Sequence, residues 1–301
     1  MIRQAGRALR SKRSAVRDLV ELVRMPAALS VPGDVIAGAA AAGVLDRRTA
    51  GLACASVCLY WAGMAANDWA DRHVDALERP GRPIPSGRVS PGAALAVAAG
   101  LTAGGVSAAA LIAGPRAGAL AMVLAAAVWV YDITAKNTAA GPAAMALCRV
   151  LDVLLGAAPR ERAAGALPTA LSAALPAALT VGAHTYLLTL LSRREVSGAG
   201  PHLPAGTLAA TLALAATVCR RQGWTQNTLA AWYAAHFGLA QARAAADPSA
   251  PSIGAAVGSG ITALPALQGA LIAHAGARGA GLAVAAAAPV GRILATKVSP
   301  T

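Results

Sequence analysis

Ten apolar segments separated by short polar loops constrain the fold of this chain more than any other feature. They span residues 26–45, 50–66, 91–113, 117–131, 141–158, 167–191, 203–219, 225–245, 253–275 and 279–294. A helix needs about 20 apolar residues to cross a bilayer, and most segments approach that length. Because backbone groups inside lipid must be satisfied internally, the pattern predicts an all-α, polytopic transmembrane helical bundle. The last segment is short and rich in alanine, so we expect about nine helices, with limits of eight and ten.

The balance of apolar and charged residues also indicates a membrane protein. Hydrophobic residues make up 56% of the 301 residues and charged residues 13%, against roughly 25% charged in a soluble domain. The formal net charge is +13, but the basic residues lie between apolar segments and form no patch with interleaved aromatic residues. We therefore expect no nucleic-acid partner. The charge suits orientation in the lipid bilayer and attraction to anionic lipids and substrates.

The first 25 residues differ from the rest of the chain. Residues 1–24 carry seven Lys or Arg residues, and residues 15–25 are amphipathic, which is typical of a helix lying on the cytoplasmic membrane surface. We therefore divide the chain into a basic interfacial segment, residues 1–25, and a single transmembrane domain, residues 26–301.

Three polar loops are expected to share one face of the membrane. If the basic leader is cytoplasmic, alternation of the spans brings these loops to the cytoplasmic side, as the positive-inside rule favours. They are residues 67–90, 132–140 and 192–202. The prediction is a multi-pass integral membrane protein whose active-site loops face the cytoplasm.

The first polar loop begins with carboxylates in helical register. If this stretch is helical, Asp68, Asp71 and Asp75 follow at steps of three and four and lie on one face. Asn67 lies beside them. Like charges on one face repel each other, so the arrangement calls for a cation, and Mg²⁺ commonly bridges one or two carboxylates to substrate phosphates. All four residues are candidate Mg²⁺ ligands, and Asp68 and Asp71 are candidate catalytic residues.

Arginines follow these acidic residues in a loop rich in Pro and Gly. Arg72, Arg79 and Arg82 carry guanidinium groups that suit the outer oxygens of a diphosphate, as does Arg88. With the carboxylates they predict a magnesium-diphosphate site at the membrane surface. The alternative is an ordinary polar loop between two membrane helices, with its mixed charges in solvent.

The second polar loop adds Tyr131 and Lys136. Lys136 is placed to neutralise a diphosphate as a point charge, and the Tyr131 hydroxyl to donate to a departing phosphate oxygen. The alternative is a pair of interfacial anchors, with the tyrosine at the headgroup level.

The third loop and one span supply further candidates. Arg193 and Arg194 suit a phosphate, and Glu195 suits a second metal site, although a solvated turn explains all three. Within the fifth apolar segment, Arg149 and Asp152 stand three residues apart and can form an ion pair on one helical face. Arg149 is therefore either a structural partner or a substrate-binding residue, because intramembrane charges commonly mark functional sites.

These motifs resemble the first signature of the UbiA superfamily of intramembrane prenyltransferases. The residues that carry the resemblance are Asn67-Asp68-x-x-Asp71-x-x-x-Asp75 and Arg82-Pro83-Ile84-Pro85-Ser86-Gly87, together with Glu21 to Arg24 and Tyr131 to Lys136. The resemblance implies a helical bundle around a central cavity that opens to lipid. It also implies that Asn67 and the three aspartates bind the diphosphate of a polyprenyl donor through Mg²⁺, while Lys136 contacts the phosphates.

The chain departs from that family in one region. The family carries a second acidic signature, Asp-x-x-x-Asp, after its sixth helix, whereas residues 191–197 hold Glu195 as their one acid. Residues 131–137, 147–156 and 185–198 look like the divergent EboC-like branch of the superfamily.

Three functions follow from these features. The first is a Mg²⁺-dependent membrane prenyltransferase that moves a polyprenyl group from an allylic diphosphate to a small acceptor. The second is a terpene cyclase that ionises an isoprenoid diphosphate without an acceptor. The third is a non-catalytic component that binds or exports a lipid phosphate.

Overall fold

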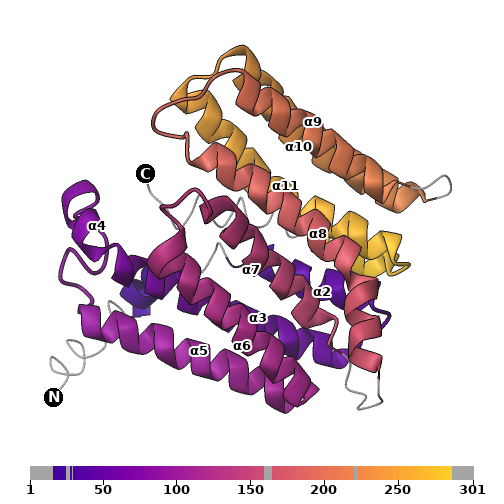
Figure 1. Ribbon diagram of the computed structural model, residues 1–301, viewed down its shortest axis with the longest axis horizontal. Helices are drawn as coiled ribbons and strands as arrows, with labels where there is room; N and C mark the ends of the chain where they lie inside the picture. Colours follow the sequence, from indigo (N-terminus) through magenta and orange to yellow (C-terminus); the bar gives the residue numbers. More distant parts are fainter. Residues whose placement is uncertain (1–15, 25–27, 29, 159–164, 220–222, 287–301) are drawn as a thin grey trace, which may run out of the picture.

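The computed structural model describes residues 16–24, 28, 30–158, 165–219 and 223–286, and every regular element in these ranges is helical (Figure 1). Their bounds are α2 Val31–Ala41, α3 Arg47–Ala70, α4 Arg72–Glu78, α5 Pro91–Ala113, α6 Pro115–Val130, the π-helical turn η2 Tyr131–Ala135, α7 Gly141–Gly156, α8 Ala166–Ser192, α9 His202–Val218, α10 Trp224–Ala246 and α11 Ala250–His274. The all-α prediction is confirmed.

The ends of the chain are described in part. Residues 16–22 are helical, in agreement with the predicted amphipathic helix. Residues 278–286 are also helical, and they include the described part of the last apolar segment, residues 279–286. Residues 23 and 24 form a turn, and residues 15, 25 and 287–294 of the two predicted segments lie outside the described residues. The division at residue 25 stays a prediction.

Five helices of the described chain have the length and hydropathy to cross a membrane. They are α3, α5, α6 with η2, α8 and α11, while α2 and α9 are apolar but shorter. The multi-pass bundle is therefore confirmed, and the number of about nine helices stays a prediction.

The bundle has two groups of helices joined through its middle. Helix α3 packs along α5, and α5 along α6, in one group, whereas α10 packs along α9 and α11 in the other. Figure 1 shows α9 and α10 along one side and α3, α5 and α6 along the opposite side. The short helix α2 contacts α3, α7, α8 and α11, so it lies where the two groups meet.

Small residues let the central helices approach closely. A Cβ added to Gly38 of α2 would lie 1.8 Å from the backbone oxygen of Val153, and one added to Gly156 of α7 would lie 2.0 Å from the oxygen of Val35. Such contact through glycine is a common means of packing helices in lipid, where apolar burial alone gives little driving force.

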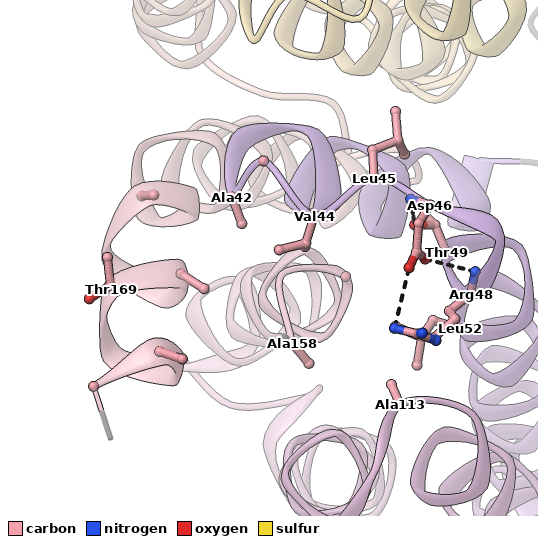
Figure 2. Close-up of a pocket in the computed structure, with 16 residues that line it drawn as sticks. Ala42, Val44, Leu45, Asp46, Arg48, Thr49, Leu52, Ala113, Ala158 and Thr169 are labelled. Carbon is pink, nitrogen blue, oxygen red and sulfur yellow. Dashed lines mark hydrogen bonds and ion pairs between the residues drawn. The ribbon is translucent and has the colours of Figure 1, made fainter. Parts of the chain in front are cut away.

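A large hollow lies at the end of the bundle opposite the predicted motif loops. Its volume is about 1020 Å³, and its lining comes from the connection between α2 and α3, the end of α5, and the start of α8 (Figure 2). The polar groups here have structural roles, because the Asp46 carboxylate accepts from the Arg48 amide and caps α3. The predicted site residues of the three polar loops lie at the other end.

Candidate active site

The three polar loops meet at one end of the bundle, as predicted. Lys136 of the second loop forms an ion pair with Asp71 of the first loop, with 2.7 Å between Nζ and Oδ1. Arg193 of the third loop donates to the backbone oxygen of Thr138 in the second at 2.8 Å. Arg79 of the first loop interacts electrostatically with Glu195 of the third.

Two of the predicted aspartates are buried and already paired with guanidinium groups. Arg82 Nη1 lies 2.5 Å from Asp75 Oδ2 and 3.3 Å from Asp68 Oδ1, so one arginine bridges both carboxylates. Arg24, which precedes the first predicted span, donates to Asp68 Oδ1 at 2.8 Å. Asp68 and Asp75 are 4% and 3% exposed, so unpaired carboxylates there would be strongly destabilising. Arg24 was not among the predicted site residues, because only the tertiary fold brings it to Asp68.

Asp71 is the accessible carboxylate of the set. Its side chain is 28% exposed, and its one ion-pair partner in the described chain is Lys136. It also interacts electrostatically with Tyr131 and with Asp132. Asp71 is therefore the predicted ligand most available to a substrate-borne cation.

Asp132 is a site residue that sequence reasoning missed. It lies in the π-helical turn η2 and is 2% exposed, and its Oδ1 accepts from Asn67 Nδ2 at 3.0 Å. A π-turn redirects side chains relative to an α-helix and is common at functional sites. The signal available in the sequence was an acid directly after Tyr131 at the end of an apolar segment.

The remaining predicted site residues divide into two groups. Arg72 folds back on Trp69, donating to its backbone oxygen at 2.8 Å and stacking over its ring at 4.8 Å. Arg194 and Glu195 are exposed on the third loop. Neighbouring atoms partly shield the Glu195 carboxyl and raise its pKa, while Arg79 acts in the opposite direction. The structure thus places Arg79, Arg193, Arg194 and Glu195 at the rim.

The predicted ion pair of Arg149 with Asp152 is not a direct contact, although the two groups interact electrostatically. Arg149 Nε lies 2.8 Å from Asp34 Oδ2 on α2, and the Asp152 carboxylate accepts from the Ser56 hydroxyl on α3. Residues three apart on a helix can meet, but partners on packed neighbouring helices compete for the same groups. The polar groups of α7 therefore join three helices.

A narrow cavity runs inward from this charged end. Its volume is about 80 Å³, and it is lined by Val31, Ser56, Leu59, Tyr60, Gly63, Met64, Leu124, Val128, Tyr131, Asp132, Met145, Cys148, Arg149 and Asp152. Tyr131 and Asp132 mark its outer part, and its middle is mostly apolar. The arrangement suits an anionic group outside and a hydrocarbon or small molecule within.

The residues present fit a magnesium ion that arrives with a diphosphate. The described residues contain no group of three or more His, Cys, Asp or Glu side chains placed to hold a metal by themselves. Mg²⁺ needs only one or two carboxylates when substrate phosphates supply other ligands. The carboxylates of Asp71 and Asp68 meet that requirement, and the cations paired with them, Lys136, Arg24 and Arg82, lie beside the same position.

The transmembrane helical bundle and the charged loops over its internal cavity place this chain in the class of integral membrane proteins with a site inside the bundle. This chain belongs to the UbiA prenyltransferase family, whose model matches residues 29–244.

Its relatives include digeranylgeranylglyceryl phosphate synthases. The synthase of Natronomonas pharaonis is 43% identical over 90 residues, which cover 29% of this chain and 32% of that protein. The synthase of Methanopyrus kandleri is 43% identical over 104 residues, or 32% of this chain and 36% of that protein. These matches span about a third of the length of the relatives. The bacteriochlorophyll synthase 33 kDa chain of Rhodobacter capsulatus is 76% identical over 25 residues, 8% of each chain.

Solved structures share the fold. A structure described as digeranylgeranylglyceryl phosphate synthase in membranes aligns with a TM-score of 0.62 and 16% identity, covering 87% of this chain and 98% of that one. The apo structure of a UbiA homolog from Aeropyrum pernix K1 aligns with a TM-score of 0.55 and 23% identity, covering 90% and 98%.

Proposed function

We propose that this protein is a Mg²⁺-dependent membrane prenyltransferase that moves a polyprenyl group from an allylic diphosphate to a small acceptor. The observation that carries the proposal is the Asp71–Lys136 pair from two loops beside the outer end of an apolar cavity. The charged groups suit a diphosphate, and the cavity wall suits the carbon skeleton attached to it. Family membership supports the reaction class.

The carboxylates and the cations of the site have different roles in binding the diphosphate. Asp71 and Asp68 would hold Mg²⁺, which offsets the charge of the leaving diphosphate when bound. Lys136, Arg24 and Arg82 exchange a carboxylate partner for a phosphate oxygen and so neutralise the anion further.

The cavity supports the second half of the reaction. When the allylic C–O bond breaks, its electron pair leaves with pyrophosphate, and an acceptor lone pair forms the new bond to carbon. Tyr60 and Tyr131 line the cavity. The Tyr131 hydroxyl would donate to the departing oxygen, and the two rings would stabilise the positive charge that develops on the allylic carbon. The released acceptor proton passes to a base or to solvent.

The test is turnover of allylic diphosphates by the purified protein with Mg²⁺, measured as pyrophosphate release and prenylated product. Because the relatives are named for digeranylgeranylglyceryl phosphate, geranylgeranyl diphosphate belongs in the chain-length series. Asp71→Asn is expected to lower turnover by at least 100-fold without loss of folding, since the carboxylate that meets the cation is gone. Asp247→Asn is the matched control, because it changes an exposed carboxylate of the α10–α11 connection that accepts from the Ser249 and Ser252 hydroxyls.

The outcomes separate the alternatives. Pyrophosphate release with a cyclic hydrocarbon and no acceptor adduct would support the cyclase. Binding of the diphosphate without turnover, unaltered by Asp71→Asn, would support a carrier and contradict both enzyme functions. Near-normal product formation by Asp71→Asn would refute the assignment of this residue.

A further inference from the structure

The inner end of the narrow cavity is made of polar side chains that are already paired. Ser56 of α3 and Arg149 and Asp152 of α7 line this end. The Asp152 carboxyl is hydrogen-bonded to the Ser56 hydroxyl, and Arg149 Nε lies 2.8 Å from Asp34 Oδ2. These groups satisfy one another and need no ligand. We call the Ser56–Asp152 contact, which joins α3 to α7 across the end of the cavity, the polar floor.

Closely packed protein lies directly behind the polar floor. One turn deeper, Leu52 of α3 and Leu155 of α7 are 3% and 0% exposed, and both belong to one core with Val35 of α2. At Gly156 the approach of α7 to α2 leaves no room even for a Cβ. Leu52 and Gly156 also line the large hollow at the opposite end (Figure 2). This packed layer therefore separates the two spaces and closes the narrow cavity from within.

The distance from the charged end to the polar floor limits the length of chain that fits between them. At the outer end, a Cβ added to Gly63 would lie 3.4 Å from Asp132 Oδ2. Ser56 is seven residues before Gly63 on α3, and this separation corresponds to about 10 Å along the helix. An extended carbon chain advances roughly 1.2 Å per bond, as an extended backbone does, so a four-carbon isoprene unit spans about 5 Å. Two isoprene units therefore fill this length.

The lining and the volume of the cavity agree with a short hydrocarbon. Leu59, Leu124 and Val128 lie between the two ends and present apolar side chains, which suit a prenyl chain. At roughly 10–15 Å³ for one water-sized group, the volume of about 80 Å³ admits only a few such groups. That is far too little for the chain of a four-unit donor, so its outer units would remain outside the cavity.

We propose that the polar floor of Ser56 and Asp152 limits the part of the donor inside the cavity to two isoprene units, so that geranyl is the longest prenyl group held along its whole length. The inference rests on the proposed prenyl transfer and adds the chain-length class of the donor. A third unit inside the cavity would separate Ser56 from Asp152 and leave both polar groups against hydrocarbon, which is costly.

Binding of S-thiolodiphosphate analogues, which resist ionisation, tests the proposal without turnover. The series is dimethylallyl, geranyl, farnesyl and geranylgeranyl, measured by calorimetry with Mg²⁺ and the protein in detergent micelles. Empty micelles give the partition of each chain into detergent, which is subtracted. We expect geranyl to bind about 10-fold more tightly than dimethylallyl, because its second unit is buried, and each further unit to add little. A gain from the third unit as large as that from the second would overturn the proposal.

Removing the polar floor should lengthen the cavity. The double variant Ser56→Ala/Asp152→Ala deletes both members of the pair, so neither is left without the other. The space that it opens should raise the ratio of farnesyl to geranyl affinity about 5-fold or more. Ser172→Ala/Asp247→Ala is the matched control, because it changes an exposed serine and an exposed aspartate, and it should keep the wild-type ratio. An unchanged ratio in the folded floor variant would refute the proposal.

A second variant covers the case in which the floor variant does not fold. Cys148 lines the cavity one turn outside Asp152 on α7 and is 6% exposed. Cys148→Leu enlarges the wall at this level and leaves the polar floor intact, so it moves the inner limit outward. The ratio of geranyl to dimethylallyl affinity should fall about 5-fold or more. A role in packing alone would lower the unfolding temperature and leave this ratio unchanged, and that result would contradict the proposal.

The length limit and the reaction can fail separately. If the analogues give the expected series but no allylic diphosphate is ionised, prenyl transfer fails and the length limit on binding holds. If turnover is found and the series shows no limit at geranyl, the polar floor is refuted and prenyl transfer stands. Asp71→Asn acts at the diphosphate and should weaken all four analogues by a similar factor. A changed ratio of farnesyl to geranyl affinity in that variant would contradict control of length by the floor.

Discussion

At the charged end of the bundle, each acidic residue of the first motif has a cationic partner. Spacing alone predicted that Asp68, Asp71 and Asp75 act together, because steps of three and four fix their helical face. Their partners were harder to predict. Arg24 and Lys136 lie 44 and 65 positions from Asp68 and Asp71, and local periodicity carries no information on contacts at that separation.

The bridging role of Arg82 gives a prediction for stability. Arg82→Ala removes the cation shared by two buried carboxylates and should destabilise the protein by about 3–5 kcal/mol, measured by thermal unfolding in detergent. Replacing Asp75 as well, in Arg82→Ala/Asp75→Ala, removes one stranded charge and should restore part of the loss. If the double variant is less stable than the single one, the loss does not come from an unpaired carboxylate.

At the level of helices, the sequence predicted most boundaries within a few residues, whereas the first two segments, 26–45 and 50–66, differ from α2 and α3 by three to five residues at each end. It predicted the packing of the helices poorly. The predicted segments at residues 91–113 and 167–191 correspond to α5 and α8 within one residue at each end, because apolar runs change abruptly to Pro, Gly or charged residues there. The π-turn η2 left no such signal. In alanine-rich helices the apolar periodicity is weak, so which side chain faces a cavity depends on the neighbouring helices.

The close approach of α2 and α7 gives a prediction at this level. Gly156→Val places atoms where the Val35 backbone oxygen lies, so the two helices must separate, and the thermal unfolding temperature in detergent should fall markedly. Gly104→Val is the matched control, because a Cβ added at Gly104 of α5 meets no heavy atom within 4 Å. Equal losses in both variants would mean that helix propensity, not packing, governs the effect.

For the molecule as a whole, the shared loop end leads to a prediction of topology. In a variant without Cys54, Cys58, Cys148 and Cys219, Val196→Cys should react with a membrane-impermeant maleimide only from the cytoplasmic side. Leu45→Cys, at the opposite end of the bundle, should react only from the other side. Val196 and Leu45 are 95% and 39% exposed. The reverse labelling pattern would place the proposed active site on the opposite face.

The amphipathic helix at residues 16–22 is joined to the first loop by Arg88. Its guanidinium bonds Asp18 at 2.6 Å and Glu21 at 2.7 Å. The bond to Arg88 lowers the Glu21 pKa below its ordinary value of 4.5. The stabilisation that this ion pair gives to the helix is therefore present above pH 4.5 and is lost as the pH falls through the lowered pKa. Arg88→Ala should therefore speed amide hydrogen exchange in residues 16–24 at pH 7, and wild type should show the same change only in acid.

Persistent protection in Arg88→Ala would show that apolar contacts hold the helix. Buried Leu22, which packs with Ala65 and Ala66 of α3, is the side chain that would provide them.

The double engagement of Arg82 has a consequence for turnover under the proposed function. A guanidinium that meets pyrophosphate strongly would slow its departure, and the product would then inhibit the enzyme. Asp75 and Asp68 lie within 3.3 Å of Arg82 and compete with the anion for the same N–H groups. Under the proposed function, these carboxylates displace pyrophosphate from Arg82, which limits product retention and restores the resting ion pairs after each cycle.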